Sequence, residues 1–126
     1  MSGYIIIDGV TYNVPVVALT ETCDMLDKYA ERVETGELKR ELIGTYHNYR
    51  VEFGSGATPA EMAALWLKLT EAVEFHTVTV PDDGGDYTFT AYFANMQREI
   101  RKVSGATAFW RNLTADFIAK IPRRTP

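Results

Sequence analysis

The chain has one cysteine and two histidines among its 126 residues, so it has few of the side chains that most metal sites and many catalytic centres need. Cys23 alone cannot form a disulfide within the chain, and Cys/His groups with zinc-site spacing are absent. This cysteine usage agrees with folding in a reducing compartment. No apolar run approaches the roughly 20 residues that cross a bilayer, and the first residues lack a basic stretch of signal-peptide type. We therefore expect synthesis in the cytoplasm and no membrane partner.

Motifs for catalysis or cofactor binding are also missing. His47 and His76 lack HxH or HExxH spacing, and we expect each to be a partly exposed strand histidine. The turn at 54–56 lacks the Gly-Lys-Ser/Thr of a phosphate loop. The acidic stretch 82–86 lacks the alternating oxygen ligands of an EF-hand, which favours an acidic hairpin tip. We expect no enzyme, no cofactor and no metal.

The charge balance gives no basic face for nucleic acid, because the formal net charge is −4. We expect no sequence-specific nucleic-acid binding. Three cations near the end of the chain, Lys120, Arg123 and Arg124, are typical of a solubilising terminus. The 46% hydrophobic content is that of a globular protein, and the length fits a single domain over residues 1–126.

Period-two alternation dominates the chain and predicts strands. Residues 4–7 and 10–14 flank Asp8-Gly9, which predicts a hairpin with a type I′ turn. A strand is expected over 42–53, with one face formed by Ile43, Tyr49, Val51 and Phe53. Further strands are predicted at 75–80, 87–93 and 113–121, with a turn at 81–85 and a polar connection at 95–108 that turns near Ser104-Gly105.

One helix is predicted at about residues 58–72. Thr58, Pro59 and Glu61 form a capping-box sequence, and Met62, Leu65, Trp66 and Leu69 follow at helical spacing. The expected fold is therefore mostly β (α+β): a β-sandwich or split barrel of about six strands with one flanking α-helix.

Residues 20–41 leave two alternatives open. Leu26, Tyr29, Ala30 and Val33 have helical spacing, whereas the density of charge and the turn at Gly36 suit an extended charged arm. Charges of alternating sign on such an arm can pair with a neighbouring subunit, and outward tyrosines are enriched at interfaces. The candidate interface residues are Asp24, Asp27, Lys28, Tyr29, Arg32, Glu34, Lys39, Arg40, Tyr46 and Tyr92.

Several stretches resemble a group of small tail structural proteins from tailed phages and prophages of Gram-positive bacteria. The resemblance lies in the texture and order of the sequence rather than in a catalytic signature. It covers residues 4–17, 26–32, 36–49, 66–81, 87–93 and 110–119.

The resemblance implies a non-enzymatic virion component with the β-sandwich and flanking helix of tail-tube, tail-terminator and distal-tail proteins. Members of that group form rings, commonly sixfold, by joining sheets edge to edge, and a loop or hairpin between early strands reaches the adjacent ring or subunit. Residues 20–41 occupy that place here. We therefore expect a tube- or baseplate-like tail protein, with partners that are copies of itself in a hexameric ring and other tail proteins around a channel that can pass DNA. The alternative is a monomeric adaptor for a surface ligand.

Overall fold

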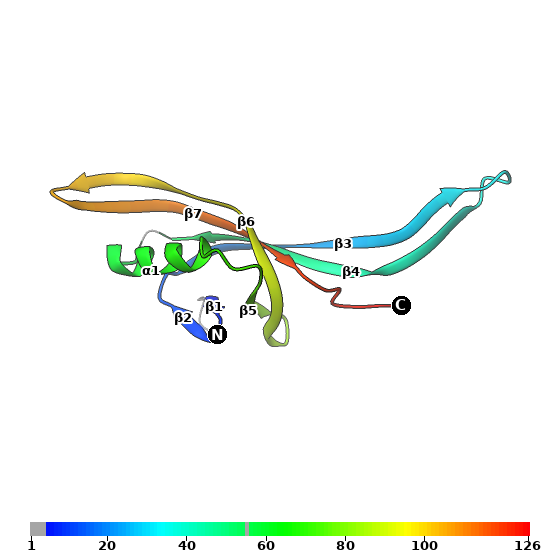
Figure 1. Ribbon diagram of the computed structural model, residues 1–126, viewed down its shortest axis with the longest axis horizontal. Helices are drawn as coiled ribbons and strands as arrows, with labels where there is room; N and C mark the ends of the chain where they lie inside the picture. Colours follow the sequence, from blue (N-terminus) through cyan, green and yellow to red (C-terminus); the bar gives the residue numbers. More distant parts are fainter. Residues whose placement is uncertain (1–4, 55) are drawn as a thin grey trace.

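The computed structural model describes residues 5–54 and 56–126, which form seven strands and one helix (Figure 1). The elements are β1 (Ile5–Ile7), β2 (Val10–Tyr12), β3 (Val16–Arg32), β4 (Leu38–Phe53), α1 (Pro59–Leu69), β5 (His76–Asp82), β6 (Gly85–Ser104) and β7 (Thr107–Ala119). The mostly-β fold with one helix is confirmed. The first residue of the predicted 4–7 strand lies outside the described residues.

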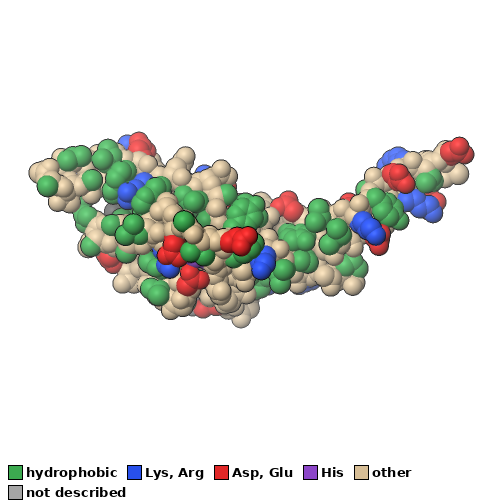
Figure 2. All heavy atoms as spheres, viewed as in Figure 1, with side chains coloured by type: hydrophobic (Ala, Val, Ile, Leu, Met, Phe, Trp, Pro, Cys, Tyr) green, Lys and Arg blue, Asp and Glu red, His purple; other side chains and the backbone are tan. Residues whose placement is uncertain are grey.

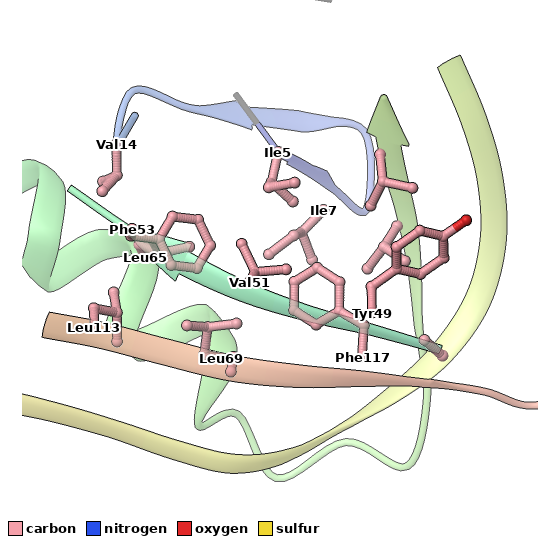
Figure 3. Packing of buried hydrophobic residues seen from close by; sticks show 14 of the residues in the cluster. Ile5, Ile7, Val14, Tyr49, Val51, Phe53, Leu65, Leu69, Leu113 and Phe117 are labelled. Atoms are coloured by element: carbon pink, nitrogen blue, oxygen red, sulfur yellow. The ribbon is translucent and has the colours of Figure 1, made fainter. Parts of the chain in front are cut away.

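All seven strands belong to one antiparallel sheet in the order β2-β1-β5-β6-β7-β4-β3. The sheet curls, so that β1 and β2 face β4 and β7 across a shared core (Figure 3). The described strands therefore form one curled sheet and not the two separate sheets of a β-sandwich. The sheet has one strand more than expected, because the charged segment forms β3, which pairs with β4. β4 is also longer than the predicted 42–53 strand, since it begins at Leu38.

The core lies inside this curl and is completed by α1. Ile5 and Ile7 of β1 point toward Val51 of β4 and Phe117 of β7 (Figure 3). The predicted alternation in β4 is confirmed for Tyr49, Val51 and Phe53, which are all buried. Ile43 was assigned to the same face and is exposed, because β4 at that point has left the core and lies in a projecting hairpin.

Helix α1 begins with the predicted capping box. The Thr58 hydroxyl accepts a hydrogen bond from the Glu61 backbone N–H at 3.2 Å, and the Glu61 carboxylate accepts one from the Thr58 N–H at 3.0 Å. Met62, Leu65 and Leu69 are buried against the sheet, and Trp66 is partly buried beside them. The helix ends at Leu69, three residues before the predicted limit, and Thr70 caps its last turn.

Residues 20–41 are extended and not helical. β3 and β4 pair from Val16 with Phe53 to Arg32 with Leu38, and the chain reverses through Val33–Glu37 with Gly36 at φ +83°. Register shifts at Leu26/Asp27 and Asp27/Tyr29 interrupt the period-two pattern of this strand. The resulting hairpin projects far beyond the core (Figure 1).

Residues 95–108 are a second projecting hairpin and not a polar connection. β6 and β7 stay paired to Ser104 with Thr107, and the predicted turn is confirmed at Gly105, which has φ +62°. Three register shifts between Ala94 and Lys102 break the period-two alternation, which explains why the sequence did not predict a strand. Asn95 and Asn112 have positive φ at this irregular stretch, a conformation that Asn tolerates.

The two short hairpins agree better with the predictions. Asp8 and Gly9 have φ values of 51° and 81°, as a type I′ turn requires. The predicted turn at 81–85 is shorter than expected, since β5 and β6 pair up to Asp82 with Gly85 and only two residues connect them.

Leu65→Ala tests whether α1 completes the core. Leu65 is fully buried, so its truncation is expected to lower the free energy of unfolding by about 3 kcal/mol. Leu67, on the same helix and 70% exposed, provides the matched control, and Leu67→Ala is expected to change stability by less than about 0.5 kcal/mol. Urea denaturation measures both values. Equal effects of the two substitutions would contradict this packing of α1.

Candidate assembly surfaces

The β3–β4 hairpin carries most of the candidate interface residues. Its residues 21–41, here called the acidic hairpin, contain seven Asp and Glu against four Lys and Arg, a net charge of −3. Eight of the ten candidates lie on it: Asp24, Asp27, Lys28, Tyr29, Arg32, Glu34, Lys39 and Arg40. All are exposed except Asp27, which is half-buried.

Many of these charges are paired across the hairpin. Arg40 Nε lies 2.6 Å from Asp27 Oδ1, and Lys28 Nζ lies 3.9 Å from Glu41. Asn48 donates to Asp24 at 2.7 Å. Exposed pairs of this kind contribute at most about 1 kcal/mol each, so their main effect is to favour one cross-strand register.

Apolar side chains are exposed between the charges. Met25 is 59% exposed, Tyr29 48% and Leu38 50%, and Leu26 and Val33 are also exposed. Figure 2 shows hydrophobic and charged side chains interspersed along the projection that ends at the right. An isolated two-stranded ribbon has no second layer to cover such groups, which makes the acidic hairpin a candidate contact surface.

The outer side of β3 is a long strand edge. β3 is the last strand of the sheet, and within residues 5–54 and 56–126 it pairs with β4 alone along its 17 residues. An unpaired edge of this length presents backbone donors and acceptors to another chain. Natural proteins usually keep edge strands short or bulged, and here the register shifts lie between Val16 and Ala18 and around Asp27, leaving the stretch from Ala18 to Leu26 regular.

The two predicted tyrosines lie apart. Tyr46 borders a shallow hollow of about 290 Å³ with Met25, Leu26 and Ile118, at the base of the acidic hairpin. Tyr92 is 42% exposed on β6 and borders a different hollow of about 310 Å³ with Phe75 and Phe93. The structure therefore brings Tyr46 close to the other candidates and separates Tyr92 from them.

The β6–β7 hairpin has the opposite charge. Its residues 96–112, here called the basic hairpin, contain four Lys and Arg against one Glu, a net charge of +3. Arg98 lies between two indole rings, 4.4 Å from the centroid of Trp66 and 3.8 Å from that of Trp110. This stack joins the hairpin to α1. Partial burial lowers the pKa of Arg98, which stays charged because an arginine side chain keeps its proton at ordinary pH.

The basic hairpin was not among the surfaces predicted from the sequence. Its signal was a cluster of Arg98, Arg101 and Lys102 followed by Phe109 and Trp110, which mixes cations with aromatic rings. Lys102 Nζ lies 4.9 Å and Arg101 Cζ 5.7 Å from the Phe109 ring. Without the pairing of β6 with β7, these residues are too far apart in sequence to be recognised as one face.

The end of the chain is bound to the sheet rather than serving as a free solubilising terminus. Arg123 Nη2 lies 2.6 Å from Asp82 Oδ2, and its guanidinium stacks 3.8 Å from the Tyr87 ring centroid. Thr45 exchanges backbone hydrogen bonds with Arg123 and Arg124. Gly44 permits this approach, because a Cβ there would lie 2.6 Å from the Pro122 Cβ. The contact fixes where the acidic hairpin leaves the core.

A polar network lies next to this contact. Glu21 Oε2 accepts a hydrogen bond from the Tyr49 hydroxyl at 3.1 Å and lies 2.6 Å from His47 Nδ1 and 3.8 Å from Arg123 Nη1. Burial and the Glu21 carboxylate raise the pKa of Tyr49, so its hydroxyl stays protonated as a donor. His47 is half-exposed, as predicted.

His76 is buried, not partly exposed. Its ring stacks on Phe93 at 4.7 Å, and Nδ1 lies 2.7 Å from Asp8 Oδ2. Asp8, Glu71 and His76 together have the ligand atoms that a cation could use. Lys68 Nζ already lies 3.6 Å from Asp8 and 3.2 Å from Glu71, so an ammonium group neutralises these carboxylates. The geometry favours a structural hydrogen-bond cluster that ties the β1–β2 turn to β5 and α1.

None of the helices in the described part of the chain is long and apolar enough to cross a membrane. Comparison with family models, with curated proteins and with solved structures gives no match for this chain.

Asp8→Asn tests the His76 cluster while keeping the turn, because Asn also tolerates positive φ. The His76 hydrogen bond lowers the pKa of Asp8, so this contribution to stability is present above the unfolded pKa of about 3.9 and is lost as the pH falls through the folded value. We expect a loss of about 1 kcal/mol at neutral pH, modest because Asp8 is partly exposed, and a smaller difference from the wild type near pH 3. Urea denaturation across pH measures it, with Asp83→Asn in an exposed turn as control. A pH-independent difference would contradict the ionic role.

Arg98→Ala tests the link between the basic hairpin and α1. Both tryptophans of the chain lie in this stack, so intrinsic fluorescence reports on it directly. We expect a red-shifted emission and a loss of stability of about 1 kcal/mol, since the indole faces lose their cation and become more hydrated. Arg101→Ala, over Phe109, is the control and should leave the emission unchanged. An unaltered spectrum for Arg98→Ala would contradict the stack.

Proposed function

We propose that this chain is a non-enzymatic structural protein that assembles with copies of itself, as a tube- or baseplate-like component of a phage tail. The observation that carries the assembly proposal is the 17-residue outer edge of β3, which continues into the acidic hairpin with its exposed apolar side chains. A monomer gains nothing from such an edge, whereas a neighbouring copy can satisfy its backbone groups.

The tail assignment has its support in the sequence resemblance. Two features of the fold are compatible with the tail assignment: a curled sheet with one helix, and a long hairpin between early strands. Contacts in which one edge of each copy meets a different surface of the next give a ring when the rotation between copies closes. The proposed location is therefore the virion, with assembly in the host cytoplasm, and a ring of six is the expected closed form.

A monomeric adaptor for a surface ligand is the second candidate. The hollow bordered by Phe75, Tyr92 and Phe93 favours it, since aromatic side chains around a concavity are typical of binding sites. The adaptor does not account for the long edge of β3. The two candidates differ in their prediction for the oligomeric state.

Replacement of residues 27–43 by Asn-Gly tests the assembly proposal. Leu26 and Gly44 are cross-strand partners, so a two-residue turn can close the shortened hairpin, and Thr45 keeps its hydrogen bonds to the end of the chain. The wild type is expected to form rings or larger oligomers as concentration rises, and the shortened chain to stay folded and monomeric. Analytical ultracentrifugation and negative-stain microscopy measure the states.

The apolar-to-charged variant Leu67→Lys, on the exposed face of α1, is the control and should assemble like the wild type. A wild-type chain that is monomeric at every concentration and salt tested would refute the proposal in favour of the adaptor. Normal assembly of the shortened chain would show that the contact uses the remaining β3 edge, from Val16 to Leu26, and not the distal part of the acidic hairpin.

A further inference from the structure

We propose that the acidic hairpin of one copy docks against the basic hairpin of the next, in a head-to-tail contact. This inference rests on the proposed assembly and names its partner surfaces. The starting observation is that the two hairpins have net charges of −3 and +3 in a chain whose total is −4. Opposite potentials on two projecting elements favour and orient association between copies.

The two hairpins cannot meet within one copy. They leave the core toward opposite ends of the longest axis of the molecule (Figure 1). Their complementary charges are therefore available only to other molecules, and a contact between them joins unlike surfaces of identical chains. A contact of this type is heterologous, so it propagates from copy to copy and closes into a ring when the rotation allows.

The basic hairpin offers a hollow that fits a hairpin tip. A concavity of about 350 Å³ lies between it and the start of α1. Arg101, Phe109 and Trp110 line one side, and Thr58, Pro59 and Met62 line the other, together with Gly56 and Ala57. The hollow therefore combines one cationic side chain with apolar and aromatic walls, and Lys102 lies beside it on the Phe109 ring.

The tip of the acidic hairpin has the matching composition. Val33 and Leu38 flank the turn and are 37% and 50% exposed. Glu34 lies between them and has no ion-pair partner among the described residues, while Glu37 has a long 3.9 Å contact with exposed Lys39. In the docked state the apolar pair would cover Phe109 and Trp110, and the two carboxylates would meet Arg101 and Lys102.

Charge reversal on each side tests the contact. The first variant is Glu34→Lys with Glu37→Lys, and the second is Arg101→Glu with Lys102→Glu. All four side chains are exposed, so we expect both variants to keep the wild-type fold, which circular dichroism measures. Each variant alone places like charges at every contact. We expect the concentration at the midpoint of assembly to rise at least about tenfold for each.

Two combinations should restore assembly. Mixing the two variants pairs each reversed hairpin with a reversed partner and each native hairpin with a native one, and a chain carrying all four substitutions is complementary to itself. Glu52→Lys with Asp83→Lys makes the same charge change as the first variant, outside residues 21–41 and 96–112, and should assemble like the wild type. Sedimentation at low and high salt measures all samples, and high salt should weaken wild-type assembly.

The failures are distinguishable. If the wild type assembles and each of the two charge-reversed variants, tested alone, assembles equally well, the head-to-tail contact is wrong and the proposed assembly stands. If the folded variants fail and neither combination rescues them, charge complementarity between the hairpins is wrong. If the wild type binds a short DNA duplex, the second variant loses that binding and assembly is unaffected, the basic hairpin serves nucleic acid instead. A wild-type chain that never assembles overturns both proposals.

Discussion

The pairing of β4 with β7 connects the two halves of this molecule. Five residue pairs, from Tyr49 with Phe117 to Phe53 with Leu113, join the β3–β4 hairpin to the β6–β7 hairpin. Alternate residues of this ladder face the core, where Val51 and Ala115 are fully buried. Each long hairpin is marginal as an isolated ribbon and depends on this junction for its stability.

The same junction explains how a small chain supports two long projections. The buried cluster draws residues from β1, β4, β5, β6, β7 and α1, so most elements have part of their length in the core. The distal part of the acidic hairpin has cross-strand contacts such as the Arg40–Asp27 pair, whereas the basic hairpin is also held to α1 by the stack of Arg98 on Trp66. Stability should therefore fall from the core toward the tips, where local opening costs least.

Prediction from the sequence succeeded where one element is governed by local physics. The capping box at Thr58 and the Asp8-Gly9 turn need only neighbouring residues, and both formed as predicted. Prediction failed where strand pairing determines the secondary structure. Bulges near Asp27 and Gln97 break the alternation of apolar and polar residues, and these stretches are strands because each pairs with a neighbouring strand. Eight candidate interface residues share one hairpin, but the basic hairpin was not predicted, because its face forms by pairing 96–104 with 107–112. Burial of His76 likewise depends on Phe93 and Asp8, which are distant in sequence.

The opposite directions of the two hairpins have a mechanical consequence. If each hairpin is held by a different neighbour, tension along the assembly pulls β4 and β7 in opposite senses along their own axes. Hydrogen bonds between antiparallel strands lie perpendicular to the strands, so this load shears the five-pair ladder rather than unzipping it one pair at a time. Sheared bonds share the load and break together. The central ladder would thus resist extension better than its small number of pairs suggests.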